Sequence, residues 1–311
     1  MIYLVDSHHW IQAQRAQDLE PYLGGHRLLP MTPDEYAVLT PDKPPQVWVA
    51  SWRMLLSDPW LETRLSPVST IMSVTSHYNL GGGLKPSTCF SPGVIPEQAF
   101  HSALKTLGPY PCVTVNSQRL YDLLAPHRPV VLTPHGVNTA IFSPVPHTLH
   151  DPPVIGWVGK TKLAKNYRML VEALQTAAKQ TPIVFAPVEV SKQSHRIRSR
   201  AWMRDYYRRL DYYLCFSTHE GTPNPALEAA ASGVPLITTR VGTMPELVRE
   251  GENGWFVDPT VESLVDRLVT LRDVTPAQHA TMRQRIRADI EAEWTWEQRS
   301  TPIRQLVEVM A

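Results

Sequence analysis

The fold of this chain is decided by the stretch His219-Glu220-Gly221-Thr222-Pro223-Asn224-Pro225-Ala226-Leu227-Glu228-Ala229-Ala230-Ala231-Ser232-Gly233. The apolar run before it, Tyr212 to Phe216, predicts a buried strand. Asn224 can cap a helix, Pro225 fits the first helical turn, and Gly233 stands where a left-handed C-terminal cap is expected. The stretch therefore predicts a strand that leads through a loop into a helix of about two turns.

Two glutamates of this stretch, Glu220 and Glu228, have seven residues between them. Glu220 falls on the predicted loop and Glu228 one turn into the helix. Both lie near the carboxyl end of a strand, which is the edge where open α/β sheets bind ligands. Carboxylates beside exposed helix amides suit a ligand with several hydroxyls and an anionic group, such as a nucleotide sugar. The alternative is a pair of surface carboxylates favoured by the dipole of a helix start.

The whole region resembles glycosyltransferase family 4, whose GT-B fold binds its donor sugar nucleotide with this Glu-seven-Glu element. The resemblance continues through Val234-Pro235-Leu236-Ile237-Thr238-Thr239, Val241-Gly242-Thr243-Met244-Pro245-Glu246-Leu247-Val248 and Gly251-Glu252-Asn253-Gly254-Trp255-Phe256-Val257-Asp258-Pro259. It covers residues 133 to about 272 well, whereas the first 130 residues match only in outline. It implies an α/β protein with two Rossmann-like α/β/α domains that face each other across a cleft.

The resemblance also implies a donor site and a reaction. Glu228 would bind the ribose hydroxyls, and Glu220 would act as a catalytic residue on the sugar hydroxyls. Further donor contacts are implied for Gly159, Gly221, Thr222, Pro223, Asn224 and Leu227. The reaction would move a sugar from a nucleotide-sugar donor to a hydroxyl of a soluble acceptor, with retention of its anomeric configuration. A UDP-sugar is favoured because such donors are common.

Lys160 and Lys165 are the predicted catalytic cations. Breaking the bond to a nucleoside diphosphate leaves negative charge on the distal phosphate, and fixed cations in a water-poor cleft stabilise that charge most in the transition state. The two lysines are similar to the family's paired basic residues, usually an Arg and a Lys. A lysine in the first position loses bidentate geometry, which makes Lys165 the firmer assignment. Lys162 competes for the role.

Three histidines and a glycine are candidates on the first half of the chain. His77 ends a predicted strand, where the family often carries a histidine that reaches the donor sugar, although a structural histidine is the alternative. Many members have a glycine pair directly after the first strand, whereas this chain has Asp6 there, followed by Ser7, His8 and His9. His8, His9 and Gly82, within a triple glycine, are predicted acceptor-site residues.

The chain divides into two domains and a returning tail. Apolar runs alternate with helical stretches in both halves, as in parallel sheets covered by helices. Residues 145–153 are proline-rich and poor in apolar residues, which predicts a linker. We therefore expect an acceptor-binding domain over 1–148, a donor-binding domain over 149–291, and a C-terminal helix over 292–311 that packs back on the first domain.

The composition is that of a globular protein without a metal or cofactor. The 311 residues carry a net charge of +1 and three cysteines, which have no redox or metal-ligand spacing. No apolar run is long enough to span a bilayer, and the start does not read as a signal peptide, so a cytoplasmic location is expected. The chain has no Asp-x-Asp motif and no His/Cys/Asp cluster with metal-ligand spacing. We expect metal-independent transfer and no cofactor.

Several alternatives stay open. The same fold serves sugar-nucleotide epimerases, and a binding module could keep the cleft without turnover. A small-molecule or glycan acceptor is favoured, but the acceptor could be a nucleic acid, including a modified base in DNA, because residues 195–209 interleave arginines with aromatic residues. That cluster could also be a solvated amphipathic helix, or could meet an anionic membrane surface or a partner protein. The oligomeric state is left open.

Overall fold

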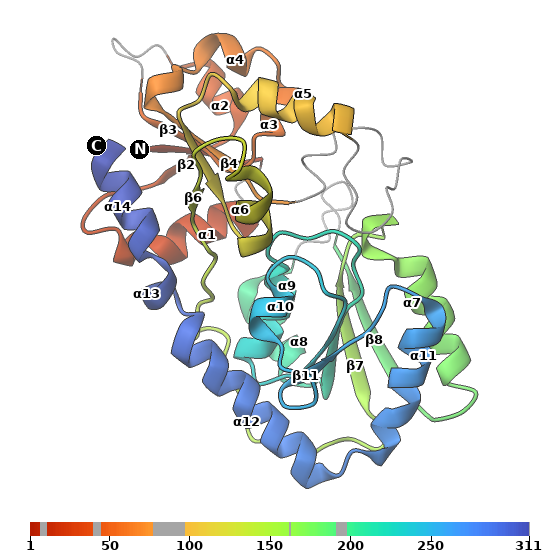
Figure 1. Cartoon of the computed structure of the whole chain (residues 1–311). Coiled ribbons are helices and arrows are strands. Elements are labelled where there is room, and N and C mark those ends of the chain that lie inside the picture. The colour runs from red at the N-terminus through yellow and green to blue at the C-terminus, as the bar shows by residue number, and fades with distance from the viewer. Residues whose placement is uncertain (7–10, 40–44, 77–96, 162, 191–197, 311) are drawn as a thin grey trace.

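The protein contains two parallel β-sheets, one from each half of the chain (Figure 1). The computed structural model describes residues 1–6, 11–39, 45–76, 97–161, 163–190 and 198–310. The first sheet has six strands in the order β2 (Leu29–Met31), β1 (Ile2–Leu4), β3 (Val47–Val49), β4 (Thr70–Val74), β5 (Cys112–Val115) and β6 (Val131–Leu132). The second has five in the order β11 (Gly254–Phe256), β10 (Leu236–Thr238), β9 (Tyr212–Cys215), β7 (Val154–Gly159) and β8 (Val184–Glu189).

Helices cover both faces of the first sheet. One face packs against α1 (Ile11–Leu19), α13 (Trp296–Arg299) and α14 (Thr301–Met310). The other face packs against α2 (Pro33–Ala37), α3 (Met54–Ser57), α4 (Leu61–Arg64), α5 (Glu97–Leu107) and α6 (Gln118–Leu124). Short 3₁₀ helices lie at Glu20–Tyr22 and Pro67–Ser69. Burial on both faces explains why the strands are short apolar runs rather than alternating ones.

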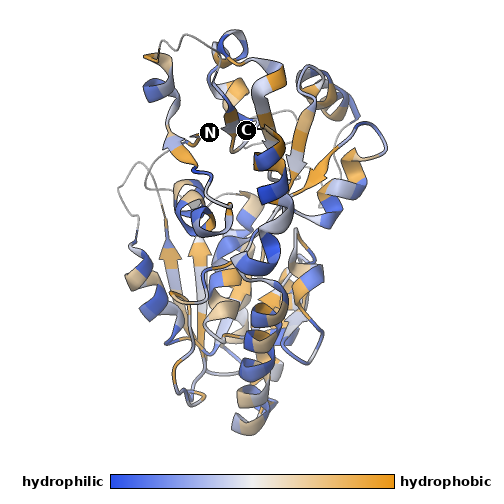
Figure 2. Ribbon diagram, turned by 90° about the vertical axis from the view of Figure 1, so that its left-hand side faces the viewer, coloured by the Kyte–Doolittle hydropathy of each residue, from blue (hydrophilic) through white to orange (hydrophobic). Residues whose placement is uncertain are grey.

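The second sheet is covered in the same way. One face carries α7 (Tyr167–Ala177) and α11 (Val261–Thr270), and the other carries α8 (Arg200–Tyr207), α9 (Asn224–Ala231), α10 (Met244–Leu247) and α12 (Pro276–Glu293). Two 3₁₀ helices, Leu163–Lys165 and Leu271–Asp273, complete the order. Figure 2 shows hydrophobic residues concentrated on the strands and hydrophilic ones spread over the outer helices. The predicted architecture of two Rossmann-like domains is confirmed.

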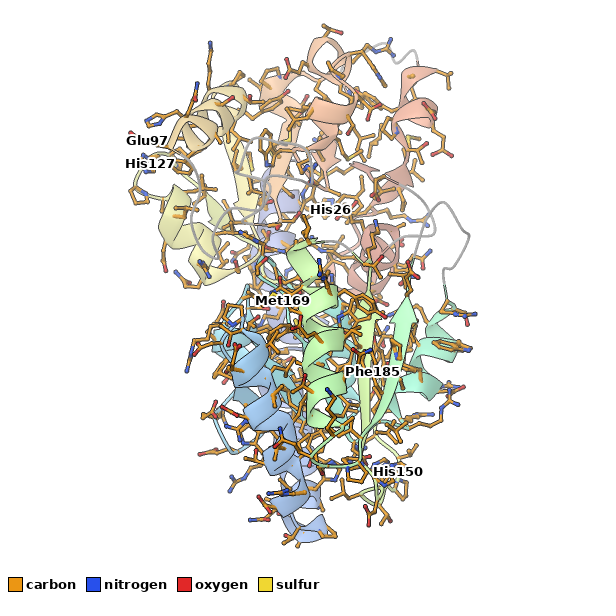
Figure 3. All side chains as sticks on the ribbon, turned by 90° about the vertical axis from the view of Figure 1, so that its right-hand side faces the viewer. His26, Glu97, His127, His150, Met169 and Phe185 are labelled. Carbon is orange, nitrogen blue, oxygen red and sulfur yellow. The ribbon has the colours of Figure 1, made fainter. Side chains whose placement is uncertain are left out.

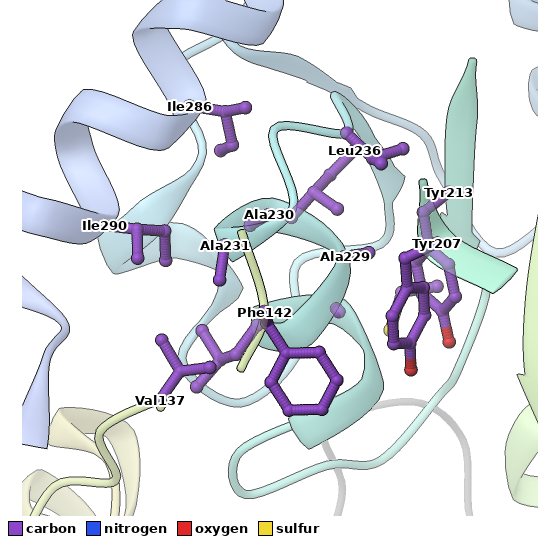
Figure 4. Packing of buried hydrophobic residues seen from close by; sticks show 14 of the residues in the cluster. Val137, Phe142, Tyr207, Tyr213, Ala229, Ala230, Ala231, Leu236, Ile286 and Ile290 are labelled. Carbon is purple, nitrogen blue, oxygen red and sulfur yellow. The ribbon is translucent and has the colours of Figure 1, made fainter. Parts of the chain in front are cut away.

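The segment between the two sheets is packed rather than loose. Val137 and Phe142 belong to one buried cluster with Ala231 of α9 and with Ile286 and Ile290 of α12 (Figure 4). The chain then returns to the first domain through α13 and α14, which are drawn in blue beside that domain in Figure 1. The Gln46 side-chain amide donates to the Met310 carbonyl there. The linker and the tail therefore tie the two domains together.

Most predicted elements form, with local differences. The sequence predicts strands over 70–74 and 112–115 and a helix over 118–124, and all three form with these bounds. The capping box that Thr275 and Gln278 predict at the start of α12 is also present. The sequence also predicts one helix over 51–61, but only α3 forms within it and α4 begins at Leu61, because Pro59 lacks an amide hydrogen and keeps Asp58 out of helical geometry. Sequence analysis did not predict β2, α2 or α5.

The helix of the deciding stretch begins differently from the prediction. Pro223 occupies the N-cap position, no side chain caps the helix, and Asn224 is its first residue. The Asn224 Oδ1 atom instead faces His135 Nδ1 at 3.2 Å. Gly233 has a φ of +75°, so the left-handed cap at the other end is confirmed.

Candidate active site between the two domains

A pocket of about 360 Å³ lies at the carboxyl ends of β7 and β8. β7 has β8 on one side and β9 on the other, so the pocket lies where the strand order reverses, the usual ligand site of an open α/β sheet. The start of α9 forms one wall, and Gln14 of α1 reaches it from the first domain. It is lined by the predicted residues Gly159, Lys160, Lys165, Glu220, Thr222, Pro223, Asn224 and Glu228. Residues from two domains thus surround one cavity.

Lys165 and Glu220 form an ion pair in this pocket. The Lys165 Nζ atom donates to Glu220 Oε1, and the Ser217 hydroxyl donates to the same oxygen at 2.8 Å. The two side chains are 26% and 14% exposed. Burial lowers the pKa of Lys165, but the charge and hydrogen bond of Glu220, together with Cys215, outweigh burial and leave that pKa raised. Lys165 therefore stays positively charged at neutral pH.

Local backbone contacts hold Lys165 in place. It ends the 3₁₀ helix Leu163–Lys165, and the Thr218 amide donates to the Ala164 carbonyl at 2.9 Å. Asn166, the next residue, has a φ of +47°, a left-handed conformation that asparagine tolerates better than most residues. The chain can then turn directly into α7. The loop of Glu220 and the segment of Lys165 are fixed to one another before any ligand binds.

Glu228 lies deeper, under Tyr207 of α8. The fully buried Tyr207 hydroxyl donates to Glu228 Oε2 at 2.8 Å. Burial raises the pKa of Glu228 to about 7, although the Tyr207 hydrogen bond and the charge of Arg200 oppose the rise and Asp18 adds to it. Glu228 is therefore about half ionised at neutral pH, and it can accept hydrogen bonds from hydroxyls in either state.

Gly221 lies at a close contact between the two domains. A Cβ atom at Gly221 would lie 1.8 Å from the Thr75 carbonyl oxygen, at the end of β4. Ser76 and Gly221 form an antiparallel bridge, and the Thr222 hydroxyl donates to the Asn116 carbonyl at 3.3 Å. Only glycine allows this approach of two backbones. Gly221 therefore positions the domains and does not line the pocket.

Not every predicted site residue reaches the main pocket. Leu227 lines a small neighbouring cavity together with Glu228. The predicted residues His8, His9, His77 and Gly82, and the competing Lys162, lie outside the described residues. The structure thus brings together the donor-side candidates of the second domain.

Sequence analysis missed two features of the first domain. A polar pocket of about 440 Å³ lies where β1, β3 and β4 end, lined by Asp6, Ser51, Arg53 and Ser76 among others. Polar residues directly after three strands were the available signal. Arg15 of α1, the second feature, is buried beside the donor loop, and its helix carries no motif that marks it.

One group among the described residues could hold a metal ion. His147, His150 and Asp211 present ligand atoms within 4.8 Å of one another, and the buried Asp211 carboxylate also accepts from the Val154 amide at 2.6 Å. Asp211 precedes β9 and Val154 opens β7, so the group lies at the edge opposite the pocket; Figure 3 shows His150 at the far end of the second domain. It is a cluster that sequence spacing could not reveal.

The arginine–aromatic segment is partly packed inward. Trp202 stacks on Tyr206 at 5.6 Å between ring centroids, and Arg198 lies 4.8 Å from the Trp202 ring. Arg200 makes two hydrogen bonds to Asp18 of α1, at 2.7 and 2.6 Å, and so joins the two domains. Within the described residues, no helix is long and apolar enough to cross a membrane.

Parts of the chain match known glycosyltransferases in sequence. Residues 152–273 match the family model described as Glycosyl transferases group 1. The chain is 43% identical over 68 residues to D-inositol 3-phosphate glycosyltransferase of Corynebacterium glutamicum, a match over 22% of this chain and 16% of that protein. It is 27% identical over 121 residues to the lipopolysaccharide core biosynthesis glycosyltransferase LpsE of Rhizobium meliloti, over 35% of this chain and 36% of that protein. The chain thus matches well under half the length of these relatives.

A solved structure shows the same fold over the whole molecule. Anabaena Alr3699/HepE, crystallised with UDP-glucose, superposes with a TM-score of 0.69 at 15% identity and covers 99% of both chains. The comparisons therefore show a GT-B fold over the chain and a match to the Glycosyl transferases group 1 model over residues 152–273.

Proposed function

We propose that the protein is a retaining, metal-independent glycosyltransferase that moves a sugar from a UDP-sugar to a hydroxyl of a soluble acceptor. The observation that carries the proposal is the single pocket that holds Lys165, Glu220 and Glu228 at the strand-order reversal of the second sheet. UDP-glucose in the crystal structure of Anabaena Alr3699/HepE favours a UDP-sugar. We place the reaction in the cytoplasm, where the free thiols of Cys112 and Cys215 would stay reduced.

Each side chain has a part in this reaction. Glu228 binds the ribose hydroxyls, and Glu220 binds the sugar hydroxyls. Lys165, with Lys160, stabilises the charge that grows on the distal phosphate as the bond from the sugar carbon to the phosphate oxygen breaks. The acceptor oxygen bonds to that carbon on the same face, and its proton passes to the departing phosphate oxygen. Glu220 is already hydrogen-bonded by Lys165 and Ser217, which suits binding better than nucleophilic attack.

Nucleotide binding gives the first test. UDP at about 100 times its Kd should stabilise the protein by about 2.7 kcal/mol, and thermal shifts with UDP, GDP, ADP and CDP should be largest for UDP. Glu228→Gln should weaken UDP binding, whereas Glu262→Gln, an exposed glutamate of the same domain, should not. Equal shifts for all four nucleotides would contradict a preference for UDP-sugars, and an unchanged Kd in Glu228→Gln would place the site elsewhere.

The stereochemistry gives the second test. NMR of the slow hydrolysis of UDP-glucose should show the α anomer of glucose first, before mutarotation. The β anomer first would contradict retention. A changed sugar still attached to UDP would identify an epimerase, and bound UDP-glucose that never turns over, even with acceptors, would identify a binding module.

A further inference from the structure

Arg15 is a buried cation that pairs with no acidic side chain among the described residues. Its side chain belongs to a residue that is 7% exposed, and its Nε and Nη2 atoms have no hydrogen-bond partner. The guanidinium lies 5.5 Å from the Trp48 ring and 5.9 Å from the Trp296 ring. These contacts hold it in place but do not neutralise it. Because an arginine stays protonated and an unpaired buried charge is costly, an anion is the natural partner.

The nearest acidic side chain on the same helix is already engaged. Asp18 lies one turn further along α1, but its carboxylate accepts two hydrogen bonds from Arg200 and one from the Asn138 side chain at 2.8 Å. It forms no ion pair with Arg15 within 4.0 Å among the described residues. Asp18 therefore serves the contact between the domains rather than Arg15.

A cavity of about 140 Å³ opens beside Arg15, and its other walls also carry unpaired polar atoms. These are the buried atoms Gln12 Oε1, Asn116 Oδ1 and His135 Nε2. A single water takes up about 30 Å³ in the liquid, so the cavity has room for a larger group. Unpartnered polar atoms on several residues that line one cavity indicate a ligand that could supply their partners.

The chemistry of these atoms describes the ligand. His135 Nδ1 faces Asn224 Oδ1, which places the ring proton on Nδ1 and leaves Nε2 as an acceptor. Burial first, and then the charge of Arg15, hold the pKa of His135 well below its usual range, so the ring is neutral. The cavity thus offers one cation and three hydrogen-bond acceptors. It fits an anionic group next to hydroxyls.

The cavity lies between the two larger pockets. It shares Thr222 and Asn224 with the pocket of Lys165, and it shares Gln12 and Thr75 with the polar pocket of the first domain. A ligand beside Arg15 would therefore touch the place where a transferred sugar meets its acceptor.

We propose that Arg15 binds the carboxylate or phosphate group of a hydroxylated substrate, carried by the acceptor or by the donor sugar. This inference rests on the proposed function, which it narrows to an anionic sugar or polyol as one of the two substrates. The hydroxyls of that substrate donate to Gln12, Asn116 and His135, and Arg15 provides the charge.

Binding measurements test this assignment without turnover. With UDP at saturation, titration with D-glucuronate, glucose 6-phosphate and neutral glucose should show at least one anion binding at least about tenfold more tightly than glucose. Arg15→Gln should remove that preference, Arg15→Lys should restore part of it, and the exposed Arg27→Gln should leave it unchanged. Comparison of UDP-glucuronic acid with UDP-glucose forms the second arm, because a preference there that depends on Arg15 assigns the anion to the donor sugar.

Failure of this inference and failure of the proposed function give different results. Retained UDP binding in Arg15→Gln shows that the variant is folded and that the nucleotide site is separate. If the variant does not fold, Arg15→Lys decides alone, with a weaker anion preference expected. The assignment is overturned if the native protein prefers no anionic probe over glucose. It is also overturned if the Arg15 variants prefer the anion as strongly as the native protein does. Absence of UDP binding in the native protein overturns the proposed function. The same titrations without UDP then still test whether anion binding depends on Arg15.

Discussion

The two domains present their charges to the cleft in opposite ways. In the second domain two opposite charges of the pocket, Lys165 and Glu220, already bind each other. In the first domain Arg15 is buried with unpaired nitrogens. An anion that reaches Lys165 must share it with Glu220, whereas an anion that reaches Arg15 meets no carboxylate paired with it in the described part of the chain. The Lys165 site is preorganised for a ligand with both charge and hydroxyls, whereas the Arg15 site selects for charge.

The family comparison divides the molecule along the same line. The matching segment, residues 152–273, lies wholly in the second domain, and residues 1–151 lie outside it. The side that we assign to the donor therefore contains the family match, and the side that we assign to the acceptor lies outside it. The predictions below test that division.

Removal of Lys165 should have the largest effect. Loss of one preorganised charge stabiliser typically lowers turnover by about 10²- to 10³-fold, so we expect that loss in Lys165→Ala with UDP binding less affected. The matched control is Lys179→Ala, an exposed lysine of the same domain. Steady-state kinetics on UDP-sugar consumption measures both. A loss of turnover below about threefold would show that Lys165 does not stabilise the transition state, and would weaken the comparison between the Lys165 site and the Arg15 site.

Gly221→Ala should be nearly as damaging, for a geometric reason. Its new Cβ would overlap the Thr75 carbonyl oxygen, so the domains must separate at that point. A displacement of about 1 Å can cost about 10²-fold in turnover, and we expect a loss of that order with each domain still folded. Gly251→Ala is the control, because its positive φ also strains alanine but no atom lies within 4 Å. Equal kinetics in the two variants would contradict a role for close contact between the domains.

The sequence predicts the second domain better than the first, and the reason is local. The loop of Glu220 and the helix of Glu228 are encoded within one short stretch, so spacing and turn residues were sufficient. β2 was missed because Leu29–Met31 is only three residues long and contains a proline, which leaves no periodic pattern. Roles that the resemblance implied for each side chain remain predictions.

Arg15 could not be predicted because its state depends on distant segments. Trp48 lies in β3, Trp296 lies in the returning α13, and His135 lies in the segment between the domains. Nothing in the local sequence of α1 shows that these groups enclose one arginine without supplying an anion. The His147, His150 and Asp211 cluster has the same origin, since Asp211 is brought to the two histidines only by the fold.

The contact between the domains at Asp18 should have a smaller effect. Asp18→Asn leaves the Arg200 guanidinium, 22% exposed, without its carboxylate. Hydrogen bonds to charged groups are worth about 1.5–3 kcal/mol, so we expect a loss of about 2 kcal/mol in the free energy of unfolding measured with urea. Asp205→Asn, which breaks an exposed ion pair, should lower the free energy of unfolding by less than Asp18→Asn does. If both variants cost the same, the two domains are not coupled through α1.

The smallest predicted effect is a pH dependence from Glu228. Because the pKa of this carboxyl is raised to about 7, its ionised fraction increases between pH 6 and 8. An ionised carboxylate accepts hydroxyl hydrogen bonds more strongly, so affinity for UDP-glucose should rise with pH by less than about tenfold. In the ligand-free protein the stability changes with pH in the opposite direction. Folding favours the protonated carboxyl, so its contribution to stability is complete below the ordinary pKa of 4.5 and is lost as the pH rises through about 7.

Opposite slopes for binding and stability are the signature of one buried carboxyl that a ligand uses in its charged form. Isothermal titration with UDP-glucose and urea unfolding, both at pH 6, 7 and 8, should therefore diverge in the native protein. Glu228→Gln should flatten both profiles, and UDP-glucose avoids the titration of a terminal phosphate that UDP would add. If Glu228→Gln keeps the pH dependence of binding, another group titrates on binding. The comparison of the paired Lys165 with the unpaired Arg15 must then include that group.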